Sequence, residues 1–209
     1  MRIFIIVLCV FSTISVFSQI EQQFSGWTQV STEFEIIKDL EIQVAQMFRF
    51  EMLPYEYNQV NTELQGTWKF NKHWKAGAEY RLTSTSKEEQ SRFAIFGRYR
   101  DGIDDFELQF RSKLQVETSN FGLPETIFRN KALLGYEITK DIMTYVSYEL
   151  FYELYEVENT FNQYRIEPGI DLRLNKHNHL SLYYIHSRSM NTNNPRIRHI
   201  SGLSYEYKW

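Results

Sequence analysis

Histidine and serine side chains come nearest to a catalytic pattern in this chain. His199 and Ser201 are two residues apart, so in a β-strand both would lie on one face. His186 and Ser187 are adjacent and would point to opposite faces, which prevents a direct pair. Nucleophilic catalysis also needs an acid that orients the base, and no carboxylate lies close in sequence to His199 and Ser201. We therefore predict that the protein is not an enzyme, with a membrane-embedded lipid acyl hydrolase or transferase as the alternative.

Other common functional motifs are missing from the sequence. The histidines and carboxylates form no cluster at metal-ligand spacing, and there is neither a phosphate-binding loop nor a dinucleotide fingerprint. The single cysteine, Cys9, lies within an apolar N-terminal run, so no disulfide or thiolate site is expected. The net charge of -3 is spread along the chain and offers no basic face for nucleic acid. We predict no cofactor, no metal and no nucleic-acid partner.

Arginine and glutamate are the abundant residues that could do chemistry, and they recur with a period of two. Such a period places them together on one face of successive strands. One function for such a face is a charged pore or an anion site. The other, which we favour, is a set of cross-strand ion pairs that fill a narrow barrel. The residues expected to line this lumen are Arg98, Arg111, Arg129, Glu137, Glu149, Arg165, Glu167, Asp171 and Arg173.

The elements that must position these charges are β-strands with apolar and polar residues in alternation. Eleven segments show the pattern between Thr28 and Trp209, and none of their apolar-face positions is Lys, Arg, Asp or Glu. The segments span residues 28–36, 40–52, 60–70, 74–82, 93–99, 106–116, 128–138, 142–152, 164–174, 180–186 and 197–209.

Alternation alone does not say which face is outside, but three features favour a membrane barrel. Most segments reach the 9–11 residues that a tilted strand needs to cross a bilayer. Short turns alternate with longer connections, and aromatic residues lie at strand ends beside the short turns. The chain ends on Tyr205, Tyr207 and Trp209, which resembles the signal read by the outer-membrane insertion machinery. We predict an all-β, antiparallel up-and-down transmembrane β-barrel of about 10–12 strands.

Two points of this prediction stay open. A secreted β-sandwich or lipocalin-like binding module, with the apolar face inward, would show the same alternation. The strand number is also open, because bacterial single-chain barrels have even counts. Either residues 19–24 add a twelfth strand, or the first segment is not part of the wall and ten remain, or eleven strands close with a parallel pair. We favour twelve.

The N-terminus predicts export. Arg2 supplies a positive charge, residues 3–16 form a short apolar region interrupted by polar residues, and Ser18 offers a cleavage point. The run is too short for a helical membrane anchor. We predict a signal peptide at residues 1–18 and a single barrel domain at 19–209, located in the outer membrane of a Gram-negative bacterium. Expected partners are membrane lipid and, during assembly, periplasmic chaperones and the insertion machinery.

The mature chain also resembles a Bacteroidetes-type family of predicted outer-membrane barrels, the domain of unknown function DUF2490. The resemblance implies the localisation and the fold but no activity, so a structural, surface-binding or small-solute role is expected, and no ligand is indicated. The residues that carry it are Gly26-Trp27, Gly77-Ala78-Glu79-Tyr80-Arg81, Phe128-Arg129-Asn130-Lys131, Tyr164-Arg165, Leu174-Asn175-Lys176-His177 and Gly202-Leu203-Ser204-Tyr205.

Overall fold

The computed structural model describes residues 21–52, 55–86, 88–119, 123–154 and 159–209, with side chains not described at 21 and 55–58. This part of the chain forms eleven β-strands. They are β1 (Glu21–Ile37), β2 (Leu40–Met52), β3 (Tyr55–Lys69), β4 (Trp74–Thr85), β5 (Glu89–Ile103), β6 (Phe106–Ser119), β7 (Glu125–Thr139), β8 (Ile142–Leu154), β9 (Thr160–Arg173), β10 (Asn178–Ser189) and β11 (Arg196–Lys208). Among the described residues, no helix is long and apolar enough to span a membrane.

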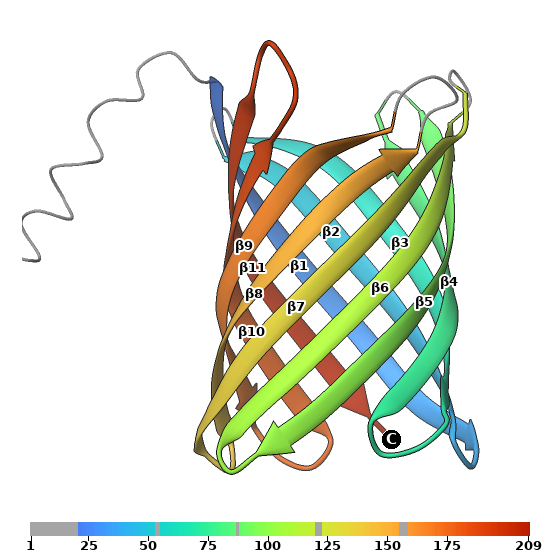
Figure 1. The fold of residues 1–209 in the computed structure, drawn as a ribbon, viewed down its shortest axis with the longest axis vertical. Coiled ribbons are helices and arrows are strands. Elements are labelled where there is room, and N and C mark those ends of the chain that lie inside the picture. Colours follow the sequence, from blue (N-terminus) through green and yellow to red (C-terminus); the bar gives the residue numbers. More distant parts are fainter. Residues whose placement is uncertain (1–20, 53–54, 87, 120–122, 155–158) are drawn as a thin grey trace, which may run out of the picture.

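The strands form one closed barrel in which each pairs with its neighbours in sequence (Figure 1). These pairs are antiparallel, but β1 and β11 close the barrel in parallel. The prediction of about 10–12 strands is confirmed, whereas our preference for twelve is wrong. Residues 21–24 extend β1 and pair with residues 196–199 of β11, so they do not form a strand of their own. An odd number of up-and-down strands must close with one parallel pair, because the first and last strands run the same way.

Most strands are longer than the alternating segments suggested, although β2 and β11 are not. Each has at least 12 residues, and β3 begins at Tyr55, within the predicted longer connection. Tyr55 and Tyr57 pair with Met52 and Phe50 of β2. Backbone pairing continues beyond the alternation because strand ends that leave the lipid no longer need an apolar outer face.

The barrel has its apolar face outside and its charged face inside. Leu134 on the outer surface is 49% exposed, and large aliphatic and aromatic side chains are exposed on every strand. Inside, Glu79 is 2%, Lys113 4% and Glu149 5% exposed. This is the arrangement of outer-membrane-type barrels, in which lipid covers the apolar band. The alternative with the apolar face inward is therefore wrong.

One end of the barrel carries the short turns and the C-terminus (Figure 1). At this end each turn is joined by a main-chain hydrogen bond to a neighbouring strand, which ties the turns into a ring. The donors and acceptors are Lys69 N to Asp39 O, Arg100 N to His73 O, Glu137 N to Asp105 O, Arg173 N to Asp141 O and Lys208 N to His177 O, at 2.8–2.9 Å.

The parallel pair between β1 and β11 is stabilised from the inside by a small apolar cluster. Trp27 of β1, Ile200 of β11 and Ile185 of β10 are buried together, with Met47 and Tyr183 packed against them. Gly202, which pairs with Trp27, leaves room for Tyr183, since a Cβ at Gly202 would lie 2.0 Å from the Tyr183 ring. The closing strands are thus held by side-chain packing as well as by the backbone ladder.

The C-terminal residue completes the same junction. The Trp209 backbone N–H donates to Glu33 O at 3.0 Å, and its indole Nε1 donates to Thr32 Oγ1 at 3.1 Å. The Tyr207 and Trp209 rings meet edge to face, with centroids 5.2 Å apart. Tyr205, Tyr207 and Trp209 therefore lie at the turn end of the barrel beside β1. Their role as an insertion signal stays a prediction.

Candidate functional site

The candidate site is the lumen, which contains a cavity of about 790 Å³. Lys75 and Thr83, near the two ends of β4, both line this cavity. So do Glu41 and Lys208 at the turn end, and Gln90 at the opposite end. The cavity therefore follows most of the height of the barrel.

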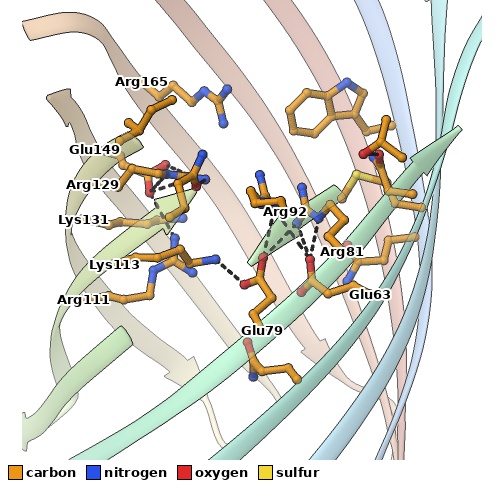
Figure 2. Close-up of a pocket in the computed structure, with 18 of the residues that line it drawn as sticks. Glu63, Glu79, Arg81, Arg92, Arg111, Lys113, Arg129, Lys131, Glu149 and Arg165 are labelled. Carbon is orange, nitrogen blue, oxygen red and sulfur yellow. Dashed lines mark hydrogen bonds and ion pairs between the residues drawn. The ribbon is translucent and has the colours of Figure 1, made fainter. Parts of the chain in front are cut away.

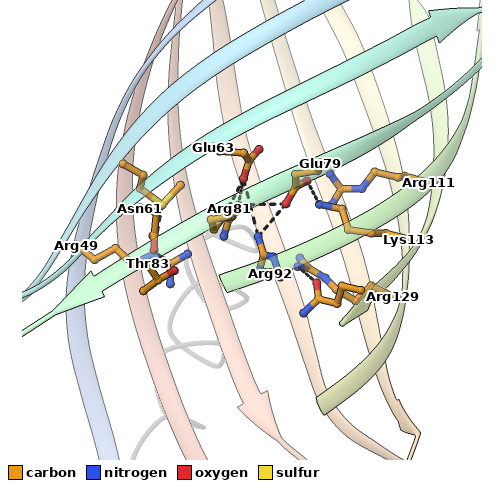
Figure 3. A network of polar contacts seen from close by, with 12 residues as sticks. Arg49, Asn61, Glu63, Glu79, Arg81, Thr83, Arg92, Arg111, Lys113 and Arg129 are labelled. Atoms are coloured by element: carbon orange, nitrogen blue, oxygen red, sulfur yellow. Dashed lines mark hydrogen bonds and ion pairs between the residues drawn. The ribbon is translucent and has the colours of Figure 1, made fainter. Parts of the chain in front are cut away.

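The middle of the lumen holds a network of ion pairs centred on Glu79 of β4 (Figures 2 and 3). Arg92 Nη2 lies 2.9 Å and Arg81 Nη2 3.8 Å from Glu79 Oε1, and Lys113 Nζ contacts Glu79 Oε2. Arg81 also donates through Nε to Glu63 Oε2 at 2.7 Å. A carboxylate this buried needs cationic partners to offset its lost hydration, and Glu79 has three.

A second network follows β6 to β9 and is centred on Glu149. Arg129 Nη2 lies 2.9 Å from both carboxylate oxygens of Glu149, and Arg111 Nη2 lies 3.1 Å from Oε1. Arg129 also donates to Gln115 Oε1 at 3.1 Å. Lys131 Nζ lies 2.9 Å from Glu167 Oε2. The Arg129–Glu149 pair is the forked guanidinium–carboxylate contact that is stronger than a single charge-assisted bond.

These ion pairs run along the wall. Arg129 and Glu149 are on adjacent strands, and Lys113 and Glu79 are separated by a single strand, β5. Lys75 and Glu41 are likewise separated only by β3. Such cross-strand pairing is the kind that the sequence led us to expect. Because these pairs follow the wall, the centre of the lumen keeps its cavity, which the sequence did not indicate.

Cations outnumber carboxylates around the cavity. Thirteen Lys and Arg and nine Glu side chains line it, which leaves four positive charges in excess. Within the described part of the chain, no carboxylate oxygen lies within 4.0 Å of Arg49, Arg98 or Arg165. Arg98 Nε is also buried without a hydrogen-bond partner among those residues. The lining of the main cavity therefore has a net positive charge.

The residues that we expected to line the lumen have three locations. Six of them, Arg98, Arg111, Arg129, Glu149, Arg165 and Glu167, line the main cavity. Glu137 lines a second, smaller cavity at the turn end. Asp171 and Arg173 lie at the turn end of β9, where Asp171 is half-buried and Arg173 is exposed.

Glu63, Glu79, Arg81, Arg92 and Lys113 were placed on the charged face by their period of two, but they were not singled out. Their importance comes from contacts between strands, which no local signal marks.

Two of the histidines, His186 and His199, lie on the lipid-facing surface. His199 Nδ1 is hydrogen-bonded to the Tyr184 hydroxyl, and its ring stacks on Phe24 at 4.9 Å. His186 lies beside it, with ring centroids 5.5 Å apart. Among the described residues no carboxylate contacts His199, so the acid of a catalytic triad has no counterpart there. The same residues contain no group of three or more His, Cys, Asp or Glu that could hold a metal ion.

Comparison with known proteins gives a family and a fold. The family model described as "Protein of unknown function (DUF2490)" matches residues 24–198. Two similar solved structures are a KdgM porin and a KdgM porin in complex with disordered oligogalacturonate. The first is 15% identical with a TM-score of 0.49, over 81% of this chain and 86% of the porin chain. The second is 14% identical with a TM-score of 0.48, over 78% and 82%. No curated protein matches the sequence.

Proposed function

The chain belongs to the DUF2490 family, and we propose that it is an outer-membrane barrel whose lumen is a narrow, water-filled passage for small solutes, preferentially anions. The observation that carries this proposal is the polar cavity that extends between the two ends of the barrel. Because the ion pairs follow the wall, water and small ions have a route between them. The four excess positive charges favour anions electrostatically.

The location is part of the proposal. An exposed apolar surface on a closed barrel requires a lipid environment, and single-chain barrels of this type belong to the bacterial outer membrane. Export through a cleaved signal peptide at residues 1–18 would deliver the chain there. Residues 1–18 lie outside the described part of the structure, so the support for a signal peptide comes from the sequence.

A planar-bilayer recording tests the passage. Protein taken from the outer-membrane fraction, where we expect it without residues 1–18, is inserted under a KCl gradient. We expect a small conductance and a reversal potential that shows Cl⁻ preferred over K⁺. Arg98→Gln should weaken that preference, because it removes a lumen charge without breaking an ion pair. Lys176→Gln, in the turn before β10, is the matched control and should leave the preference unchanged.

The outcomes separate the function classes. No conductance above the bare bilayer would overturn the passage and favour a structural or surface-binding barrel. Cation preference would contradict the role given to the excess positive charge. Hydrolysis of phospholipid by the same preparation, lost on changing His199 or Ser201, would favour the enzyme that we do not expect.

A further inference from the structure

Two arginines in the lumen share one aromatic ring and have no acidic partner. The Arg49 guanidinium of β2 lies 4.0 Å above the Trp27 ring of β1, and that of Arg165 of β9 lies 5.8 Å from the same ring. The two cations are therefore no more than about 10 Å apart, the sum of 4.0 and 5.8 Å. Within the described residues neither has a carboxylate oxygen within 4.0 Å.

The surroundings of Arg49 are cationic. The charged groups that act on it most strongly are Arg81, Arg165 and Arg92. Its only hydrogen bond within the described residues runs from Nε to Met47 Sδ at 3.2 Å, so its two Nη groups have no protein acceptor there. Both Arg49 and Arg165 line the main cavity, so an acceptor from solution can reach them.

Arg165 is held in place by neutral groups. Its guanidinium lies 4.6 Å from the Phe151 ring. With the Gln163 amide turned so that its oxygen faces Arg165 and Ser187, that oxygen accepts from Arg165 Nε at 2.8 Å, from Arg165 Nη2 at 3.2 Å and from Ser187 Oγ at 2.6 Å. Glu149 and Glu167 act on Arg165 from farther away, and their near positions are taken by Arg129 and Lys131.

The Trp27 ring lies beside both cations. The ring is packed against Ile185 and Ile200 in the apolar cluster on the inner side of β1 and β11. Cation–π contact holds a guanidinium in position but does not neutralise its charge. The carboxylates of the two ion-pair networks already have cations, and within the described residues none of their oxygens lies within 4.0 Å of Arg49 or Arg165. Two guanidiniums that line the same cavity, no more than about 10 Å apart, can donate from their remaining N–H groups to an oxyanion placed between them.

We propose that Arg49 and Arg165, supported by Trp27, form a lumenal binding site for a compact, doubly charged oxyanion of the phosphate type. The ligand is either free inorganic phosphate or the terminal phosphate of a small monoester, because both present the same group to the two guanidiniums. The proposal rests on the proposed passage only for the route by which the ligand arrives. Binding itself does not require ions to cross the barrel.

Isothermal titration of the refolded full-length protein in detergent tests the site, with inorganic phosphate, a sugar phosphate and, as a monovalent comparison, chloride at equal ionic strength. We expect phosphate to bind once per barrel and chloride to show no saturable binding. Arg49→Gln and Arg165→Gln should each weaken phosphate binding about tenfold or more, because each removes a charge-assisted contact. Lys176→Gln should bind as the wild type does. If Lys176→Gln weakened phosphate binding as much as Arg49→Gln and Arg165→Gln do, the proposal would be overturned. It would also be overturned if the wild-type protein bound no phosphate.

Comparison of inorganic phosphate with the sugar phosphate shows which of them is the ligand of the site. Binding of inorganic phosphate alone identifies the free ion as the ligand, and tighter binding of the monoester identifies a phosphorylated solute. If a variant fails to fold, the wild type still provides a test, because phosphate should raise its unfolding temperature more than chloride does. No difference between the two salts would overturn the site. Binding without conductance overturns only the passage, and conductance without binding overturns only the site.

Discussion

Single residues in this lumen act in sets, since the two most buried carboxylates, Glu79 and Glu149, each contact more than one cation. Glu149 accepts from both Arg129 and Arg111, and Glu79 from Arg92 and Lys113. A buried carboxylate with two partners keeps part of its compensation when one is removed. The energetic importance of an arginine therefore depends on what else its partner contacts.

Arg129→Ala tests this dependence. Removing one partner of a buried ion pair typically costs about 3–5 kcal/mol, and we expect about 2–3 kcal/mol here because Arg111 stays 3.1 Å from Glu149 Oε1. The measurement is urea unfolding of the refolded barrel in lipid vesicles. Arg129→Ala combined with Glu149→Gln should cost less than the two single changes added together. Strict additivity would mean that the forked contact contributes no coupling energy.

At the scale of elements, the distinctive feature is the parallel junction of β1 and β11. The hydrogen-bond ladder there is supplemented by the Trp27 cluster on the inside and by Trp209 at the turn end. Both supports involve residues at the two ends of the chain. The junction therefore joins strands that are far apart in sequence and adjacent only in the closed barrel.

Gly202→Ala tests the junction. The added Cβ would lie 2.0 Å from the Tyr183 ring, so Tyr183 must leave its place in the apolar cluster. We expect a cost of about 1–3 kcal/mol, typical of overpacking, seen as a lower folded fraction in unheated gel samples. Gly97→Ala is the matched control, because a Cβ there meets nothing within 4 Å. Adding Tyr183→Ala should restore the space, and failure of that rescue would contradict the steric explanation.

At the scale of the whole molecule, the outer surface determines where the protein can exist. Large apolar side chains are exposed around the barrel while Glu and Arg are buried inside it. In water this arrangement would be strongly unfavourable, because apolar surface is exposed and charged groups are desolvated. In a bilayer the lipid covers the apolar band, and the ion pairs of the lumen offset the lost hydration of its buried charges.

An arginine introduced on the outer or on the inner face of the barrel wall tests this orientation. Leu134→Arg on the outer face should cost about 2–4 kcal/mol, as for arginine near the bilayer midplane. Gln43→Arg on the inner face should cost less than about 1 kcal/mol, because Gln43 already donates to Glu206 at 2.7 Å and an arginine can replace that bond. Both are measured by urea unfolding in the same vesicles. Equal costs would contradict a lipid-facing outer surface.

The sequence by itself determined the features that depend on local periodicity. Alternation from Thr28 to Trp209 predicted the strands, the charge-free face and the short turns, because a side chain's face depends only on its place along the strand. The same period put Arg98, Arg129 and Glu149 on one face. This period could not show that most strands extend beyond their alternating segments.

Only the tertiary structure decided the features that join distant parts of the chain. The parallel closure and the contact of Trp209 with Thr32 both follow from how β1 meets β11. Which cations pair with Glu79 and Glu149, and which are left over, depends on strands brought together by closure. Arg49 and Arg165 look like any other inward-facing arginines in sequence. They differ because the closed barrel places them together beside Trp27, with no carboxylate oxygen of the described residues within 4.0 Å of either.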